Sequence, residues 1–349
     1  MNQSLIENPA PLQSNYVPPE FVARKREARN LSKVLDGVSD VDAQNLVVEG
    51  PRGTGKSHLV LKQLHQLPDA VNTCYVPCHR FDTECRALKQ IYQSLFDEEL
   101  SDGHHTTSVQ RKLEEHTVSE TVVVLDELDF LLQNDGNSLL YYLTRNWNQE
   151  FTLMLIKTGY TNLKAQLEER TYSSLYPQNL QFDPYSDEEI FDILAQRARK
   201  ALAPKSLQRE ALTRIASSVE NVKLGLTWLR TAAQTSRDTI TGSVVRDEAE
   251  KTYQRYADEL LADFSIHHQL IYQAIRELAV EQETPIQTGE IYSRYRDLCE
   301  VYDEEALSNR RISDFLKHLE ILELITADYK YGGSSGKTRL IQPTSIESP

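Results

Sequence analysis

Cysteine and long apolar runs are both scarce in this sequence of 349 residues. The 4 cysteines fit neither the spacing of zinc ligands nor a disulfide framework, which argues against the disulfide-stapled and zinc-stabilised classes. No stretch reaches the roughly 18 consecutive apolar residues of a membrane-spanning helix, and the first residues lack the apolar core of a signal peptide. We therefore expect a protein of the reducing cytoplasm that has no membrane partner.

Positive charge is also in short supply. Lys and Arg number 38 against 52 Asp and Glu, so the formal net charge at pH 7 is −14. Such a chain repels nucleic acid over much of its surface, and any DNA contact therefore requires a local basic patch. The length is sufficient for two or three domains with hydrophobic cores of their own.

The most informative stretch lies at 45–64, NLVVEGPRGTGKSHLVLKQL. A strand pattern precedes a G-x-x-x-x-G-K-S sequence and a helical pattern follows it, which is the context that a phosphate-binding loop requires. In such a loop the glycines let backbone N–H groups converge on phosphate oxygens, the lysine reaches the β- and γ-phosphates, and the serine hydroxyl ligates Mg²⁺. The sequence thus predicts a site for ATP or ADP formed by Gly50, Pro51, Arg52, Gly53, Thr54, Gly55, Lys56, Ser57 and His58.

A second acidic motif ends the apolar run TVVVLDELDFLL at 121–132. A continuous β-branched run predicts a buried parallel strand, and acidic side chains at its carboxyl end lie where ligands bind in open α/β sheets. Asp126 is predicted to hold Mg²⁺ together with Ser57, and Glu127 to polarise the water that attacks the γ-phosphate. Asp129 is predicted to be structural.

Two further polar features have two interpretations each. Asn162 follows the next apolar strand, so it either senses the γ-phosphate and the attacking water or caps a turn. A basic cluster on an early helix either forms a solvated helix face or approaches the nucleotide or DNA; its members are Arg24, Lys25, Arg26 and Arg29.

Hydrophobic periodicity divides the chain into four parts. Residues 1–15 are polar and contain proline, and we expect them to be a disordered tail. Strand and helix patterns alternate over 16–184, which predicts a parallel three-layer α/β core. Residues 185–262 are helical only, begin with the capping-box sequence SDEE, and predict a small lid. Three helices and a hairpin over 263–345 predict a winged helix.

The predicted winged helix would place its third helix, 307–322, in the major groove of DNA and its wing on the backbone or minor groove. The basic residues of these elements are Arg310, Arg311, Lys317, Lys337 and Arg339. Winged helices also dock proteins. Residues 262–345 hold 9 Lys and Arg against 14 Asp and Glu, a net charge of 9 − 14 = −5, which keeps the docking alternative open.

Taken together, these motifs resemble those of the archaeal initiator family of AAA+ ATPases, relatives of the eukaryotic origin-recognition subunit one and the cell-division-cycle loading factor. The likeness spans about 16–342. The segments that resemble the family are YVPPEFVARKREARNLSKVL, CHRFDTECRAL, VVVLDELDFLL, ERTYSSLYPQNLQFDPYSDEEIFDILAQRA and LSNRRISDFLKHLEILELI with the Gly-rich wing that follows it. The resemblance implies an α/β P-loop AAA+ module with a helical lid and a C-terminal winged-helix domain that binds DNA.

The resemblance also implies roles for single residues. Asn162 matches the sensor-1 position, and Arg170 stands where the family carries an arginine finger that reaches a neighbouring subunit's nucleotide. Tyr16 and Val17 are the expected contacts to adenine. Lys223 occupies the place of the family's sensor-2 arginine, and because lysine lacks the guanidinium fork, sensing of the γ-phosphate through the lid is expected to be weaker.

These features predict an ATPase that binds duplex DNA at a replication origin and helps to load a replicative helicase, with hydrolysis as a switch; the family resemblance implies that hydrolysis is slow. Assembly with further copies or relatives on DNA is expected. Two alternatives stay open: a signalling or defence ATPase whose winged helix docks protein, and a DNA-bound regulator that does not hydrolyse ATP.

Overall fold

The computed structural model describes residues 5–37, 44–101, 103–116, 120–134, 136–147, 151–282, 284–330 and 338–344. Within these residues we find no helix with the length and apolarity needed to cross a membrane. The first large unit is built on a parallel sheet with the strand order β2-β3-β4-β1-β5. Its strands are β1 (Leu46–Gly50), β2 (Asn72–Pro77), β3 (Thr121–Asp126), β4 (Phe151–Thr158) and β5 (Gln178–Gln181).

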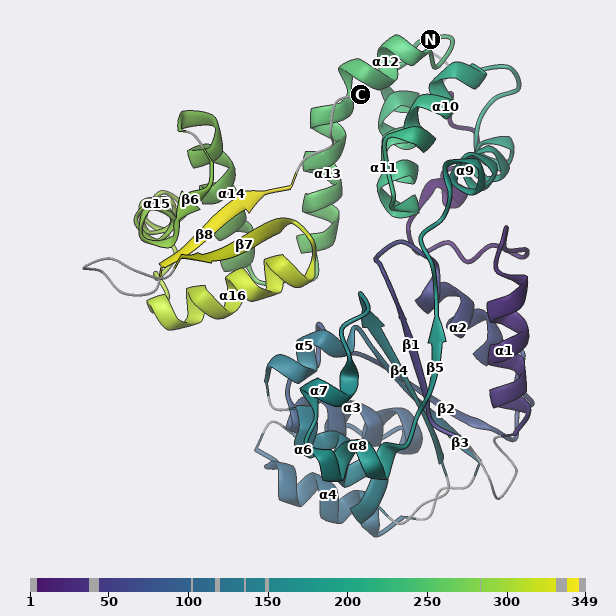
Figure 1. Cartoon of the computed structure of the whole chain (residues 1–349), viewed down its shortest axis with the longest axis vertical. Coiled ribbons are helices and arrows are strands. Elements are labelled where there is room, and N and C mark those ends of the chain that lie inside the picture. Colours follow the sequence, from purple (N-terminus) through teal and green to yellow (C-terminus); the bar gives the residue numbers. More distant parts are fainter. Residues whose placement is uncertain are drawn as a thin grey trace.

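The central strands are apolar on both faces because helices cover both sides of the sheet. Val122 and Val124 of β3 pack toward helices α1 and α2, whereas Val123 and Leu125 pack toward the opposite helical layer. Figure 1 shows these two layers on either side of the sheet. The helices of this core are α1 (Lys25–Asp36), α2 (Lys56–Leu64), α3 (Glu84–Phe96), α4 (Thr106–Glu114), α5 (Leu128–Gln133), α6 (Gly136–Tyr141) with the π-helical turn η2 (Tyr142–Asn146), α7 (Leu163–Gln166) and α8 (Glu169–Leu175).

Sheet order decides which motifs meet. Strand β4 lies between β1 and β3, and all three run parallel, so their carboxyl ends share one edge of the sheet. The phosphate-binding loop follows β1 and the acidic pair ends β3. The two motifs that are about 70 residues apart in the chain therefore face one another across the end of β4, as an open α/β sheet requires for a ligand site.

The next part of the chain is a helical lid. Its first helix begins at the predicted capping box, in which Ser186 accepts a hydrogen bond from the Glu189 amide and the Glu189 carboxylate accepts one from the Ser186 amide. The lid contains α9 (Asp187–Ala201), α10 (Arg209–Ser217), α11 (Val222–Thr235), α12 (Gly242–Asp247) and α13 (Ala249–Leu261).

The expectation of a disordered tail over 1–15 is wrong for 5–15. Leu5 and Leu12 are buried against the lid, and Leu12 belongs to the short helix η1 (Ala10–Leu12). The amide of Glu7 donates to the carbonyl of Ala201 at 2.9 Å. Two leucines that bury apolar surface and backbone that pairs with α9 offset the entropy of ordering this polar segment.

The last part is a winged helix. It contains α14 (Ile266–Glu281), β6 (Ile286–Gln287), α15 (Thr288–Val301), α16 (Asn309–Ile321), β7 (Ile325–Lys330) and β8 (Thr338–Pro343). The strands form an antiparallel sheet in the order β6-β8-β7. Helical spacing predicts a buried stripe of Ile312, Phe315, Leu316 and Leu319 on α16; Ile312, Leu316 and Leu319 are fully buried, and Phe315 is half-buried. The tip of the predicted wing, 331–337, lies outside the described residues.

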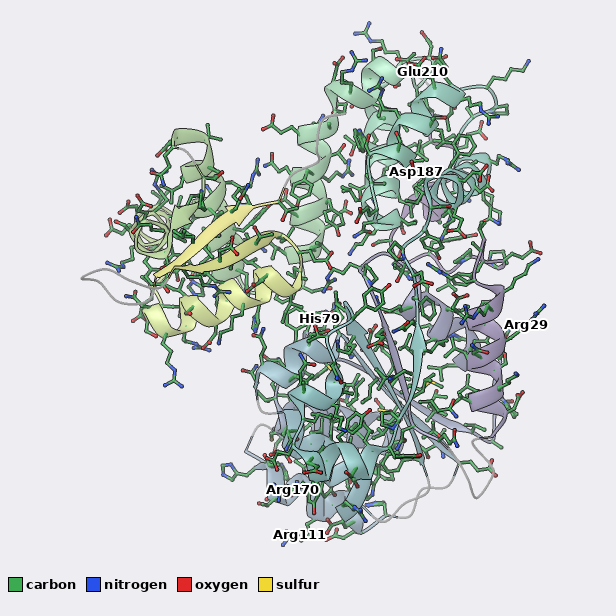
Figure 2. The ribbon with its side chains drawn as sticks, viewed as in Figure 1. Arg29, His79, Arg111, Arg170, Asp187 and Glu210 are labelled. Carbon is green, nitrogen blue, oxygen red and sulfur yellow. The ribbon has the colours of Figure 1, made fainter. Side chains whose placement is uncertain are left out.

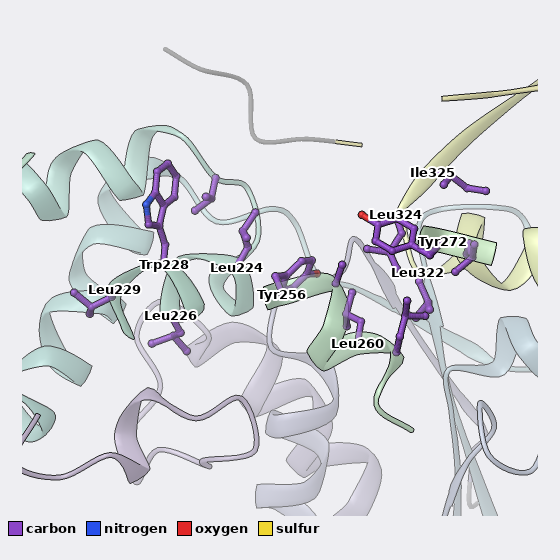
Figure 3. Packing of buried hydrophobic residues seen from close by; sticks show 14 of the residues in the cluster. Leu224, Leu226, Trp228, Leu229, Tyr256, Leu260, Tyr272, Leu322, Leu324 and Ile325 are labelled. Atoms are coloured by element: carbon purple, nitrogen blue, oxygen red, sulfur yellow. The ribbon is translucent and has the colours of Figure 1, made fainter. Parts of the chain in front are cut away.

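One continuous apolar cluster joins the lid to the winged helix. Figure 3 shows how Trp228 and Leu224 of α11 lead through Tyr256 and Leu260 of α13 to Leu324 beside the winged-helix sheet. Helix α16 also approaches α5 of the core, so the winged helix touches both of the other parts. The winged helix therefore packs close to the edge of the sheet where the two motifs meet.

Candidate nucleotide site and nucleic-acid interface

A cavity lies where the phosphate-binding loop, the acidic pair, the lid and the N-terminal segment converge. Its empty volume is about 1030 Å³, part of which is open to solvent. The loop lines it with Arg52, Gly53, Thr54, Gly55, Lys56, Ser57 and His58. The opposite walls come from Asp126, Glu127, Lys157 and Thr158 at the strand ends, Phe21 and Val22 of the N-terminal segment, and Ile193, Arg197, Lys223 and Leu226 of the lid.

The loop conformation needs glycine at three positions, the first of which is Gly50, where a Cβ would lie 2.2 Å from the carbonyl oxygen of Phe182. Gly53 has φ +73° and Gly55 has φ +86°, which is the left-handed region. A Cβ on Gly53 would lie 2.1 Å from Asn221 Oδ1, at the start of lid helix α11. The lid thus touches the loop at a place where only glycine fits, and the two walls of the cavity are held together there.

Lys56 is buried, and its ammonium group points at backbone carbonyls of its own loop. Its ammonium donates to the carbonyls of Gly50 at 2.7 Å and of Pro51 at 2.6 Å. Burial and the nearby charge of Arg52 lower the pKa of Lys56 to about 8. A triphosphate placed in the cavity would reverse this effect, because its negative charge stabilises the protonated amine. The predicted role of Lys56 as a phosphate ligand fits these surroundings.

Asp126 and Ser57 form an oxygen-rich pair that suits Mg²⁺. The carboxylate of Asp126 is buried and accepts hydrogen bonds from the Tyr75 hydroxyl and the Ser57 hydroxyl. Burial, followed by the charge of Glu127, raises the pKa of Asp126. The buried carboxylate of Asp126 and the partly buried carboxylate of Glu127 repel one another, so a hard cation with oxygen ligands relieves the site. The residues present fit the predicted metal, which would neutralise phosphate charge.

Glu127 is held by the side chains of Arg52 and His79. Its φ of +54° turns it away from β3, and Oε1 lies 2.9 Å from Arg52 Nη2 while Oε2 lies 2.6 Å from His79 Nδ1. Burial alone would raise the pKa of Glu127, but the charge of Arg52 and the contact with His79 hold it at about 2. Glu127 lines the cavity as predicted. The sequence analysis did not predict that Arg52 and His79 contact Glu127. His79 has no recognisable sequence signal other than its position just after β2.

The N-terminal segment reaches the cavity with other residues than predicted. Tyr16 and Val17 do not line it, and Val17 is 37% exposed. Tyr16 instead stacks under the guanidinium of Arg197, 4.5 Å from the ring centre. The apolar surface available to a base is that of Phe21 and Val22, a few residues further along. The chain turns between Pro18-Pro19 and the start of α1, and this turn brings Phe21 and Val22, in place of Tyr16 and Val17, to the cavity.

The prediction of Asn162 as a sensor is wrong in this structure. Asn162 is exposed, caps helix α7 by accepting a hydrogen bond from the Lys164 amide at 2.9 Å, and does not line the cavity. The groups that do face it at the end of β4 are Lys157 and Thr158. The turn-capping interpretation therefore holds, because the strand ends before Asn162. Asp129 is structural as predicted: it accepts from the Thr158 amide at 2.7 Å.

The lid brings two cations to the cavity. Lys223 lies at the start of α11 and lines the cavity, where burial and Arg52 lower its pKa. Arg197 was not predicted; it is only 6% exposed, and its Nε and Nη1 have no hydrogen-bond partner among the described residues. Donors shielded from water without acceptors are costly, and a bound ligand with acceptor atoms would satisfy them. Arg230 lies on the same helix as Lys223 but pairs with Glu259 inside the lid and does not line the cavity.

In the basic cluster at the start of α1, Arg24 approaches the nucleotide loop, whereas Arg26 and Arg29 belong to a solvated helix face. Arg24 is 4% exposed and donates from Nε to the Thr54 carbonyl at 3.2 Å and from Nη2 to the Asp183 carbonyl at 2.6 Å. Its guanidinium also lies 3.9 Å from the ring centre of Tyr185. Arg24 thus ties the phosphate-binding loop to the segment after β5. Arg26 and Arg29 remain on the solvated side of the helix.

The predicted DNA-binding residues do not behave alike. Arg310 and Arg311 are exposed at the start of α16, and Lys317 is half-buried and pairs with Asp314 at 3.0 Å. Arg339 is only 7% exposed and pairs with Glu320 across the base of the wing, so the prediction that it reaches phosphate is wrong. Lys337 lies outside the described residues.

Arg170 lies on the surface of the core, far from His79, the residue that contacts Glu127 (Figure 2). It is exposed, pairs with Glu168 at 2.6 Å, and lies over the ring of Tyr141 at 4.9 Å. A residue that acts on a neighbouring subunit's nucleotide has to be exposed in a single chain.

The fold and the cavity define an AAA ATPase module with a helical lid and a C-terminal winged helix, and the fold class predicted from the sequence is confirmed. An AAA ATPase domain model matches residues 20–156, and a model of the CDC6 C-terminal winged-helix domain matches residues 259–345. The chain belongs to the family of ORC1-type DNA replication proteins, which is the archaeal initiator family that its motifs resemble.

Individual relatives support this assignment. The ORC1-type DNA replication protein of Pyrococcus horikoshii is 30% identical over 366 residues, which covers 97% of this chain and 87% of the relative. The ORC1-type DNA replication protein 2 of Haloarcula marismortui is 27% identical and covers 94% of this chain and 85% of the relative. Among solved structures, the Aeropyrum pernix ORC1 protein in complex with DNA has a TM-score of 0.72 and 28% identity, covering 98% and 95% of the two chains.

Proposed function

We propose that this protein is an ATP-dependent initiator that binds duplex DNA at a replication origin and helps to load the replicative helicase. The observation that carries the proposal is the cavity itself. It joins a phosphate-binding loop, the Asp126-Glu127 pair and lid cations in a chain that also carries a winged helix. Its relatives are named replication proteins, and a solved relative is bound to DNA, which supports extending both properties to this chain.

At the nucleotide, the loop amides and Lys56 would bind the β- and γ-phosphates, and Phe21 with Val22 would cover the base. Mg²⁺, held by Ser57 and Asp126, would neutralise phosphate charge when bound. Glu127 would take a proton from the water that attacks the γ-phosphorus. Lys223 would report the state of the γ-phosphate to the lid, and Arg170 would complete the site of a neighbouring copy on DNA.

At the DNA, Arg310 and Arg311 at the exposed start of α16 are proposed to enter the major groove, with Lys317 and Lys337 adding phosphate contacts. The winged helix contacts the nucleotide loop through Arg52, so the nucleotide state can influence how the domain grips a duplex. Hydrolysis would then end one binding state and act as the switch.

The proposal is tested with Glu127→Gln, which keeps shape and removes the basic carboxylate. We expect ATP to bind as in the wild type while turnover falls at least about 100-fold, the range of general-base catalysis. DNA affinity should differ between the ATP and ADP states of the wild type and stay at the ATP value in the variant. Equal DNA affinity in both nucleotide states would contradict the switch.

The alternative of a protein-docking winged helix is favoured by one observation, the net charge of −5 over 262–345. Footprinting of the wild type on origin DNA separates the two functions, because a docking module leaves no protected segment. Protection that is lost in Arg310→Ala supports the initiator, and absence of any protection supports docking.

A further inference from the structure

The hydrolytic glutamate and the winged helix are connected through Arg52. The Nη2 of Arg52 lies 2.9 Å from Glu127 Oε1, and its Nε donates to the carbonyl of Ile321, the last residue of α16, at 3.1 Å. The side chain of Glu323 accepts a hydrogen bond from the Arg52 backbone amide. One residue of the phosphate-binding loop therefore holds the catalytic carboxylate on one side and the winged helix on the other.

A second connection runs on the other side of Glu127. His79 Nδ1 lies 2.6 Å from Glu127 Oε2, and His79 Nε2 lies 4.0 Å from Asp263, in the turn that joins the lid to the winged helix. Asp263 also pairs with Arg80, the neighbour of His79. Figure 2 shows His79 on the side of the core that faces α16. Both oxygens of Glu127 are thus engaged by side chains that the winged-helix region also contacts.

Aromatic packing closes the contact from outside. Phe264 lies 5.7 Å from His79 and 5.6 Å from Phe130 of α5, measured between ring centres. Phe130 in turn lies 5.2 Å from His318 of α16. These rings pack beside the polar contacts of Glu127, in which the side chains of Arg52, Glu127 and His79 are 12%, 24% and 18% exposed. An ion pair that is largely shielded from water is stronger than a fully exposed one.

We propose that the docked winged helix is a brake on ATP hydrolysis, with Arg52 and His79 as positioning residues that hold Glu127 through an ion pair on one side and a polar contact on the other. When the winged helix leaves the core, Arg52 loses the Ile321 carbonyl and His79 loses Asp263 and Phe264. The Glu127 contacts then become solvated and weak, and the carboxylate is free to turn toward the attacking water. This inference rests on the proposed hydrolysis at this site.

The test loosens the contact without touching the nucleotide. Asp263 is half exposed, so the double variant Asp263→Asn, Phe264→Ala in the full chain removes the outer charge and ring. We expect the single-turnover rate of ATP hydrolysis to rise about fivefold, equivalent to about 1 kcal/mol of barrier. The dissociation constant of ATP should stay within a factor of about two of the wild-type value, because neither residue lines the cavity.

A matched control comes from the same domain. Glu281 is an acidic residue that pairs with Arg294 within the winged helix, at 2.5 Å, and Glu281→Gln should leave the hydrolysis rate unchanged. As a second variant, Arg52→Lys keeps a positive charge near Glu127 but lacks the fork that serves Glu127 and Ile321 together, and it should also raise the rate.

The outcomes separate the two proposals. A faster rate in both variants with an unchanged control supports the brake. A rate that is unchanged or lower in both variants overturns the brake and leaves the ATPase in place. If the wild type itself binds no ATP, the proposed function fails, and this result is distinct from a failure of the brake, which requires a wild type that binds and hydrolyses ATP.

Discussion

Replacement of Gly53 by alanine should damage this protein in a way that backbone strain alone does not explain. Gly53 has φ +73°, and a Cβ there would lie 2.1 Å from Asn221 Oδ1 and 3.0 Å from Asn221 Cα. Gly159 offers the matched control, because it has φ +70° and a Cβ on it would meet nothing within 4 Å. The two substitutions share the strain and differ in the contact with the lid.

The magnitudes follow from these contacts. An alanine in the left-handed region costs about 1–2 kcal/mol in either variant. Asn221 cannot simply rotate away from a Cβ on Gly53, because its Oδ1 accepts from the Lys223 amide at 2.9 Å and its Nδ2 donates to the Tyr256 hydroxyl at 2.9 Å. Loss of this helix cap adds about 1 kcal/mol, so Gly53→Ala should be less stable than Gly159→Ala by that amount.

Nucleotide affinity should separate the variants more clearly. Moving Asn221 displaces the start of α11, which carries Lys223 and closes the cavity over the loop. We expect ATP to bind Gly53→Ala at least about tenfold more weakly, or about 1.4 kcal/mol, and to bind Gly159→Ala as it binds the wild type. Urea midpoints and titration with ATP measure the two effects. Equal midpoints and equal affinities in both variants would refute the reasoning.

Three other predictions concern the cavity and the wing. ATP binding at pH 9 should take up protons, because the free protein holds the pKa of Lys56 at about 8 and bound phosphate raises it; calorimetric heats that are the same in buffers of different ionisation enthalpy would contradict this. Arg197→Ala should weaken ATP binding about tenfold, since its donors lose a ligand partner, whereas Arg199→Ala, exposed on the same helix, should have no effect in the same titration. Arg310→Ala should lower the slope of log K against log salt for duplex DNA by about 0.9, while Arg339→Ala should lower thermal stability and leave the slope unchanged; a changed slope in the second variant would restore Arg339 as a phosphate contact.

The parts of the site that follow from short stretches of sequence were predictable. The phosphate-binding loop and the acidic pair each depend on a strand followed by a turn. Their predicted residues line the cavity, except Gly50 and Pro51, which do not. The capping box at Ser186 and the buried stripe of α16 were equally local. The prediction for Asn162 was wrong because a polar residue after a strand fits both a phosphate sensor and a helix cap. The point at which β4 ends decides between the two roles.

The sequence by itself determined the class of protein, the order of its parts and the groups that handle phosphate, because each depends on neighbours within a few residues. Tertiary structure alone decided that Arg24 supports the loop, that Arg197 faces the cavity and that Arg339 is buried. It also decided the partners of Glu127. Arg52, His79 and the carbonyl of Ile321 come from three distant segments, and no local pattern records a contact that exists only after the winged helix docks on the core.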